Sequence, residues 1–194
     1  MKKILIATRN KDKFKIVSKL LSTDNFKDFK FYSLNDLNEE IIDEKEVGDV
    51  INRSFKKALN VYNNIKINSY DYIVGIDDGI KIKNKIIENV KEYIKLIIND
   101  EILSQNEKVF IVRAYTFINN NGSYKSIFTE IPFKYTKLKE KFEIKENSYP
   151  LSHVLMPINF LKTVDKLSDA ESNDYYLKYS KNKFDEINNF FMKI

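Results

Sequence analysis

Apolar runs of strand length alternate with segments of helical periodicity along this chain, and this alternation limits the possible folds more than any other feature. Buried strands are predicted at residues 3–7, 29–33 and 72–76. Helices are predicted at 11–21, 49–65, 86–98 and 173–192, with Asp49 as the N-cap of the second. Residues 109–118 and 123–133 flank an Asn-Asn-Asn-Gly turn and predict a β-hairpin, and 148–157 predicts a structured loop or an edge strand. This order predicts an α/β fold with a mixed sheet.

The length and the absence of cysteine narrow the class of protein. The chain has 194 residues, which suits a single domain over 1–194, or one domain in two lobes. It has no cysteine, which excludes disulfides and thiolate metal sites. No apolar stretch approaches about 18 residues, and the start of the chain lacks a signal-peptide pattern. We therefore expect a cytoplasmic protein that has no membrane partner.

The net charge of +5 comes almost entirely from lysine. Lys and Arg together number 33 against 28 Asp and Glu, and arginine occurs only at positions 9, 53 and 113. A nucleic-acid-binding surface usually shows clustered arginine with exposed aromatic residues. Because the lysines are spread along the chain, we attribute the charge to compositional bias and do not expect nucleic acid as a partner. A genuine polyanion-binding surface is the alternative.

The first strand ends in small polar and basic residues just where the first helix begins. A helix N-terminus carries unpaired N–H groups and a partial positive charge, which together make an anion site. Thr8 and Asn10 offer side-chain donors there, and Lys13 lies in the first turn and can reach the same anion. These residues suit a phosphate group. The equally weighted alternative is that Asn10 is only an N-cap and that Lys11 and Lys13 are solvated.

A second group of polar residues follows the strand at 72–76. Asp77 and Asp78 are adjacent carboxylates at its predicted end, and Mg²⁺ prefers one or two carboxylates together with phosphate oxygens and water. One of them is alternatively a general base toward a water molecule. The structural alternative is an acidic turn with Gly79 at positive φ.

Both groups resemble motifs of the inosine triphosphate pyrophosphatase family, the Ham1-like nucleotidases. Residues 7–13 read Ala-Thr-Arg-Asn-Lys-Asp-Lys where the family reads Ala-Thr-Gly-Asn-x-x-Lys. Residues 76–79 read Ile-Asp-Asp-Gly and are similar to its Asp-Asp-Ser-Gly. Aligned on Gly79, Asp77 falls on the Asp that is assigned to catalysis, Asp78 falls on the serine, and Ile76 replaces the first Asp.

Three further segments resemble the family in the same order. Glu46 and Gly48 match its Glu-Thr-Gly, and Lys57 matches the lysine of its helix motif Glu-Asn-Ala-x-x-Lys-Ala, although residues 52–54 read Asn-Arg-Ser. Residues 149–157 look like its Phe-Gly-Tyr-Asp-Pro-x-Phe-x-Pro loop, and 162–167 fit its Lys-Thr-Phe-Ala-Glu-Leu. Residues 171–173 fit the first part of its closing Glu-Lys-Asn motif.

The residues that recognise the base in the family are largely replaced. Tyr149 takes the place of the loop's Phe and Pro157 that of its final Pro, whereas Ser152 replaces its Asp and His153 its first Pro. Residues 180–182, with Lys181 at the centre, stand for the closing Ser-His-Arg about one helical turn late. We expect His153 to be hydrogen-bonded in a structural role, with contact to a base as the alternative. No cysteine or second histidine exists to support a nucleophilic or metal role.

The resemblance implies an elongated mixed β-sheet flanked by helices, two lobes around a nucleotide cleft, and a homodimer. It implies Mg²⁺-dependent hydrolysis of a nucleoside triphosphate to a monophosphate and pyrophosphate, with Mn²⁺ as a possible substitute. Catalysis would fall to Asp77 and Lys13. Metal binding would fall to Glu46, Asp77 and Asp78, and substrate binding to Thr8, Asn10, Lys13, Lys57, Tyr149, Ser152, His153 and Lys181. The alternatives are a catalytically inactive nucleotide-binding relative and a nucleic-acid-binding module.

Overall fold

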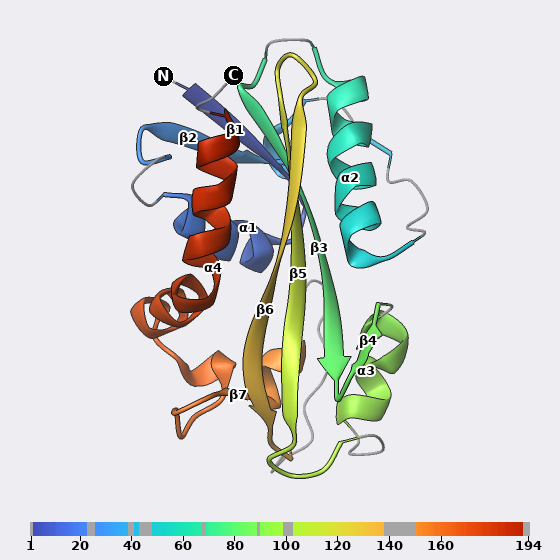
Figure 1. The fold of residues 1–194 in the computed structure, drawn as a ribbon, viewed down its shortest axis with the longest axis vertical. Helices are drawn as coiled ribbons and strands as arrows, with labels where there is room; N and C mark the ends of the chain where they lie inside the picture. Colours follow the sequence, from blue (N-terminus) through green and yellow to red (C-terminus); the bar gives the residue numbers. More distant parts are fainter. Residues whose placement is uncertain are drawn as a thin grey trace. The chain divides into compact units, whose positions relative to one another are not determined.

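The computed structural model describes residues 2–22, 26–38, 41–42, 48–66, 69–88, 90–98, 103–137 and 150–191 (Figure 1). The chain divides into two compact units. The first unit comprises Met1–Asp77, Arg113–Thr129 and Ser180–Ile194, and the second comprises Asp78–Val112 and Glu130–Tyr179. Strands β3 (Tyr72–Ile82), β5 (Lys108–Asn119) and β6 (Tyr124–Tyr135) each have residues in both units.

A parallel arrangement of strands forms the centre of the first unit. β1 (Lys2–Ala7) lies between β2 (Phe29–Ser33) and β3 and is parallel to both, with Ala7 opposite Gly75. Residues 4–7 of β1 are all buried, as expected for a parallel strand that is covered on both faces. The sheet has the order β2-β1-β3-β5-β6-β7, and β4 pairs with β3. The predicted mixed sheet of an α/β fold is confirmed.

The first two helices begin where their caps predict. α1 (Lys11–Leu21) follows Asn10, whose side-chain oxygen accepts a hydrogen bond from the backbone N–H of Lys13. α2 (Val50–Asn64) follows Asp49, whose side chain accepts from the backbone N–H of Asn52. Such caps satisfy N–H groups that have no partner within the helix.

Successive side chains of β5 point to opposite faces of the sheet in the first unit, and each face packs against a different helix. Thr116 faces α2, because its Oγ1 lies 2.9 Å from Ser54 Oγ. Tyr115 and Phe117 point the other way and contact Phe184 of α4 (Asp169–Phe191) (Figure 1). Both layers of side chains are fully buried, so this unit has an apolar core on each side of its sheet.

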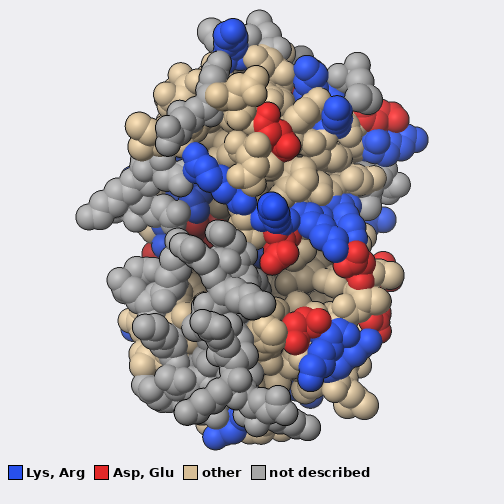
Figure 2. Space-filling model, turned by 180° about the vertical axis from the view of Figure 1, so that it is seen from behind, with Lys and Arg blue, Asp and Glu red and all other residues tan. Residues whose placement is uncertain are grey.

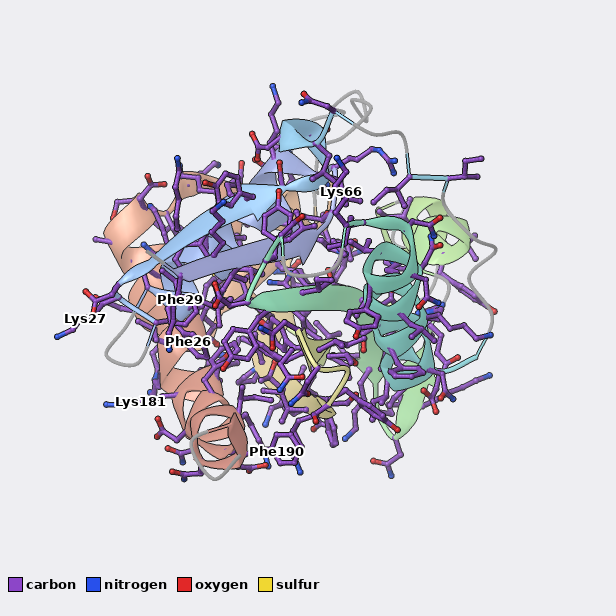
Figure 3. All side chains as sticks on the ribbon, turned by 90° about the horizontal axis from the view of Figure 1, so that it is seen from above. Phe26, Lys27, Phe29, Lys66, Lys181 and Phe190 are labelled. Carbon is purple, nitrogen blue, oxygen red and sulfur yellow. The ribbon has the colours of Figure 1, made fainter. Side chains whose placement is uncertain are left out.

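Aromatic side chains close the edge of the first unit beside β2. Phe26 packs against Phe29 with ring centroids 5.3 Å apart and stacks on Phe117 at 6.1 Å (Figure 3). Tyr72 contacts both Phe26 and Phe29. These contacts fix the segment that follows α1 against the sheet.

The β5–β6 hairpin is confirmed, and its turn shows why a glycine is present. Gly122 has a φ of +84°, and its N–H donates to the carbonyl oxygen of Asn119. A φ in this range favours glycine. β5 extends one residue further at each end than predicted, whereas β6 begins one residue later and ends two residues later.

The second unit corrects one predicted helix and confirms an edge strand. The helix predicted at 86–98 is wrong at its start, because β4 (Lys85–Ile87) pairs antiparallel with β3 and α3 (Val90–Ile98) begins only afterwards. Lys83 and Asn84 form the hairpin turn between β3 and β4. Within 148–157, β7 (Leu155–Pro157) pairs antiparallel with β6. The described residues also include three short 3-10 helices, at Leu34–Asp36 (η1), Pro150–His153 (η2) and Val164–Lys166 (η3).

Among the described residues, no helix is both long enough and apolar enough to span a membrane.

Candidate functional site

Asp77 is a buried carboxylate in the middle of a strand. β3 continues through Asp77, Asp78 and Gly79 to Ile82, so the predicted end of the strand at residue 76 is wrong. Gly79 is not among the described residues with positive φ, which also rules out the acidic-turn alternative. The side chain of Asp77 is only 5% exposed. A carboxylate this deeply buried requires compensating partners.

Two cations from α2 supply that compensation. Lys57 Nζ lies 2.6 Å from Asp77 Oδ1 and forms a hydrogen bond with it. Arg53 Nε lies 2.6 Å from Asp77 Oδ2, at an angle that makes an ion pair but no hydrogen bond. The Arg53 side chain is 7% exposed and that of Lys57 26%. Both oxygens of Asp77 are therefore held by positive charge.

A close approach of α2 to β3 places these two cations. A Cβ built on Gly75 would lie 2.0 Å from the carbonyl oxygen of Ser54 and 2.7 Å from the backbone nitrogen of Ala58. Only glycine permits the helix backbone to pack this closely on the strand. Because residues 53 and 57 are one turn apart, both side chains emerge from this contact beside residue 77.

Burial raises the pKa of the Asp77 carboxyl above its usual value, and this effect exceeds the opposing influence of the nearby cations, of which Lys57 is the strongest, followed by Lys13 and Arg53. A buried carboxylate with a raised pKa is a better proton acceptor than an exposed one. The ion pairs at both oxygens are made by its ionised form.

The predicted phosphate-binding residues lie at the end of the neighbouring strand. Because Ala7 is opposite Gly75 in a parallel pair, the loop that follows β1 begins beside the part of β3 that carries Asp77. Thr8 Oγ1 accepts a hydrogen bond of 3.2 Å from the backbone N–H of Asn10. Asn10 is an N-cap, as the structural alternative predicts, and Lys13 is close enough to act electrostatically on Asp77. The first unit thus brings together Thr8, Asn10, Lys13, Lys57 and Asp77.

The loop between β1 and α1 is held by the segment around η1. The backbone N–H of Leu34 donates to the carbonyl oxygen of Thr8 at 3.2 Å, and Asn35 Nδ2 donates to that of Arg9 at 3.0 Å. Arg9 takes the place of the glycine in the resembled motif without positive φ, and its guanidinium donates to the carbonyl oxygen of Ile41. The substitution therefore fits this backbone.

The predicted metal ligands do not form a metal site in the part of the chain that the structure describes. Glu46 lies outside the described residues, and Asp78 is half-buried on β3. No group of three or more Asp, Glu or His side chains suitable for a metal ion occurs among the described residues. Mg²⁺ prefers carboxylate and water oxygens, whereas the oxygens of Asp77 each face a cation. A divalent cation at Asp77 would therefore compete with these two side chains for the carboxylate.

The predicted base-recognition residues are divided between the two units. Tyr149 lies outside the described residues. Ser152 and His153 belong to η2 in the second unit, where His153 Nδ1 lies 2.9 Å from Asp165 Oδ2. This contact agrees with a structural role for His153. Lys181 lies in the first unit, exposed on α4 and pointing outward (Figure 3).

Lys162 and Glu171, from two of the resembled motifs, meet in the second unit. Lys162 Nζ lies 2.8 Å from Glu171 Oε2, and that oxygen also accepts hydrogen bonds from the backbone N–H and the hydroxyl of Ser168. Ser168 Oγ in turn accepts from the backbone N–H of Glu171. This reciprocal arrangement caps the start of α4, which gives both motifs a structural role.

Arg53 is the site residue that sequence reasoning missed. It was noted only as a departure from the helix motif. Arginine is rare in this lysine-rich chain, and two of its three arginines, Arg53 and Arg113, are buried. An arginine that persists against a lysine bias marks a position where guanidinium geometry is needed. The rarity of arginine in a lysine-rich chain is therefore the sequence signal that could have identified Arg53.

Comparisons with known proteins address the fold. No protein-family model matches the sequence, and no curated protein matches it. Among solved structures, a HAM1 protein from Coxiella burnetii is similar with a TM-score of 0.67 and 13% identity over 100% of both chains. The Staphylococcus aureus Ham1 protein is similar with a TM-score of 0.60 and 13% identity over 99% of both chains.

A third solved structure carries an activity in its description. It is a nucleoside-triphosphatase, or dITP/XTP pyrophosphatase, from Mycobacterium abscessus, with a TM-score of 0.56 and 16% identity over 91% of this chain and 93% of the other. At such low identity these likenesses show a shared fold. The resemblance to the Ham1-like nucleotidases is thereby confirmed for the fold.

Proposed function

We propose that this chain is a nucleoside triphosphate pyrophosphatase, which hydrolyses its substrate to a nucleoside monophosphate and pyrophosphate. The observation that carries the proposal is the buried Asp77 with Lys57 and Arg53 at its two oxygens and Lys13 nearby. Fixed positive charges of this kind suit a triphosphate, and a carboxylate among them suits proton transfer from water. The fold shared with a dITP/XTP pyrophosphatase supports the same reaction.

In the proposed reaction, Asp77 acts as the general base. Lys57 is the more exposed of its two partners, and it turns toward the triphosphate when that anion binds. Oδ1 then accepts a proton from a water molecule while the water oxygen bonds to the α-phosphorus. The bond between the α-phosphorus and the oxygen that bridges to the β-phosphorus breaks, and pyrophosphate leaves with the electron pair. Arg53 keeps Oδ2 in place throughout.

Lys13 and the loop at Thr8–Asn10 would neutralise and position the phosphate chain. Lys13 extends from the first turn of α1, beside the end of β1. Ammonium groups lower the cost of charge that moves onto the leaving pyrophosphate. Removal of Lys13 should therefore slow turnover and weaken substrate binding together.

In this proposal, the preferred base is determined by the residues that differ from the resembled family. We propose that Tyr149, Ser152, His153 and Lys181 contribute to its recognition. A panel of standard and deaminated nucleoside triphosphates, assayed with a His153→Gln variant, tests this. A change in relative KM between bases at constant kcat supports the role, and an unchanged ranking contradicts it.

A catalytically inactive nucleotide-binding relative is the second candidate. The specific observation in its favour is that both Asp77 oxygens are already engaged by cations. A nucleic-acid-binding role has less support, because Lys and Arg side chains on the face in Figure 2 have Asp and Glu side chains among them. The negatively charged phosphate backbone of a nucleic acid binds surfaces on which positive charge predominates.

The deciding experiment is pyrophosphate release from the nucleotide panel by the wild type, with Asp77→Asn as the test variant and Asp185→Asn as its matched control. Asp185 is exposed on α4. Release that falls by about 10²–10⁴-fold only in Asp77→Asn supports the proposal. Each assay with Mg²⁺, with Mn²⁺ and with a chelator tests the metal dependence that the resemblance implies. Light scattering on the same preparation tests the predicted homodimer.

A further inference from the structure

Arg53 stands where the resembled helix motif carries Glu-Asn-Ala, and it faces the carboxylate that the resemblance assigns to metal binding. Its Nε lies 2.6 Å from Asp77 Oδ2, with both side chains almost fully buried. A group with a permanent positive charge therefore lies against one of the two Asp77 oxygens that could bind a divalent cation. Guanidinium cannot lose its charge at any accessible pH.

The backbone contact beneath Arg53 keeps it in this position. The α2 backbone at Ser54 passes so close to Gly75 that even a methyl group would not fit between them. Ser54 Oγ is additionally held by Thr116 Oγ1 at 2.9 Å inside the core. A metal ion could displace Arg53 in two ways. Either α2 would have to move away from β3 at Gly75, or the guanidinium would stay buried without its carboxylate, which is unfavourable.

The charges around Asp77 favour an anion over a cation. Among the described residues, the three cations Lys57, Lys13 and Arg53 act electrostatically on Asp77. A divalent cation approaching Asp77 would be repelled by each of them. A polyphosphate anion would be attracted by the same three groups, and Arg53 would not have to move for it to bind.

We propose that Arg53 takes the place of the divalent cation at Asp77, so that this site binds a polyphosphate anion without a metal ion. The inference rests on the proposed function in that the polyphosphate is the triphosphate part of the substrate. It departs from the metal dependence that the resemblance implies, and it assigns to Arg53 the binding of the substrate's charge.

The test is calorimetric titration of the full chain with inorganic pyrophosphate, in a chelator and again in excess Mg²⁺. We expect binding in the chelator with a Kd within about threefold of the value in Mg²⁺, which is a small energetic difference. Arg53→Gln should weaken binding in the chelator by about tenfold or more, as expected when a positive charge close to the anion is removed. Lys56→Gln, on the exposed side of the same helix, should leave it unchanged.

Pyrophosphate binding that requires Mg²⁺ in the wild type would overturn the inference without reference to any variant, so it remains testable if Arg53→Gln does not fold. Folded Arg53→Gln that binds as the wild type does would also overturn it. Metal-free binding without turnover of any nucleotide leaves the inference standing and defeats the proposed function. Turnover accompanied by strictly Mg²⁺-dependent binding does the reverse.

Discussion

Lys57 Nζ and Asp77 Oδ1 lie 2.6 Å apart, which joins the middle of α2 to the middle of β3 through a partly exposed cation and a buried carboxylate. The two residues are 20 positions apart in the sequence. Because Lys57 is the more exposed of the cations that contact Asp77, it is the one that a substrate can draw away. In the proposed reaction, the pair links substrate binding to the release of a proton acceptor.

Replacing Lys57 with Gln should remove that link. We expect kcat/KM for the preferred nucleotide to fall by about 10²-fold, since a charged group that stabilises the transition state is lost. Steady-state pyrophosphate release measures this change. Lys56→Gln is the matched control, because residue 56 is the exposed neighbour on the same helix. Equal effects of the two substitutions would show that the ion pair has no part in turnover.

Gly75→Ala should disturb the fold and the site together. The added Cβ would lie 2.0 Å from the Ser54 carbonyl oxygen, so α2 must move away from β3. Overpacking of this kind costs about 1–3 kcal/mol of the free energy of unfolding. Urea denaturation followed by circular dichroism measures the loss. An unchanged midpoint would contradict the close packing on which the placement of Arg53 and Lys57 depends.

The buried hydroxyl chain across β5 and β6 should contribute to stability. Thr116 Oγ1 lies 2.9 Å from Ser54 Oγ and 2.7 Å from Ser126 Oγ. Thr116→Val removes both bonds while it keeps the shape of the side chain, and we expect a loss of about 1–2 kcal/mol. Thr129→Val is the control, because the hydrogen bond from its hydroxyl to the Arg113 carbonyl oxygen is long, at 3.4 Å. If Thr129→Val lowers the free energy of unfolding more than Thr116→Val does, the row of hydroxyl groups does not stabilise the fold in this way.

The cap of α4 should make stability depend on acid pH. Hydrogen bonds from Lys162 and Ser168 lower the pKa of Glu171 from 4.5 to about 2. A carboxyl whose pKa is lower in the folded state stabilises the fold fully above its unfolded pKa, and this contribution disappears as the pH falls from 4.5 to about 2.

The corresponding measurement compares thermal midpoints of the wild type and Glu171→Gln across that pH range. The wild type should be the more stable near neutral pH, and the difference should shrink as the pH approaches 2. Glu186→Gln serves as the control, since Glu186 pairs with Lys183 on the surface of the same helix. A difference that is constant with pH would argue against the cap.

Local patterns predicted those elements whose boundaries are set by local interactions. α1 has the predicted bounds because Asn10 caps it, and α2 starts after its predicted cap Asp49. The hairpin turn at Gly122 was likewise predictable, because its geometry favours particular residues.

The errors arose where tertiary contacts override local preference. Two consecutive aspartates normally end a buried strand, but β3 continues because cations from α2 compensate for Asp77. The first residues of the predicted helix at 86–98 instead form β4, because they pair with Ile80 and Lys81. Neither partner is visible in a short window of sequence.

The candidate site was predictable in its composition but not in its charge balance. Asp77, Lys57 and Lys13 came from matching motifs, whereas the position of Arg53 depends on how closely α2 packs on Gly75. Metal binding at Glu46 stays a prediction, since that residue lies outside the described part of the chain.

Product analysis in water labelled with heavy oxygen tests the central claim most directly. The wild type and Asp77→Asn are incubated with the preferred nucleoside triphosphate, and the products are identified by mass. The account predicts a monophosphate that carries the label, unlabelled pyrophosphate, and almost no product from Asp77→Asn. Label in pyrophosphate or in free phosphate, or equal product from both proteins, would contradict attack at the α-phosphorus by a water molecule that Asp77 activates.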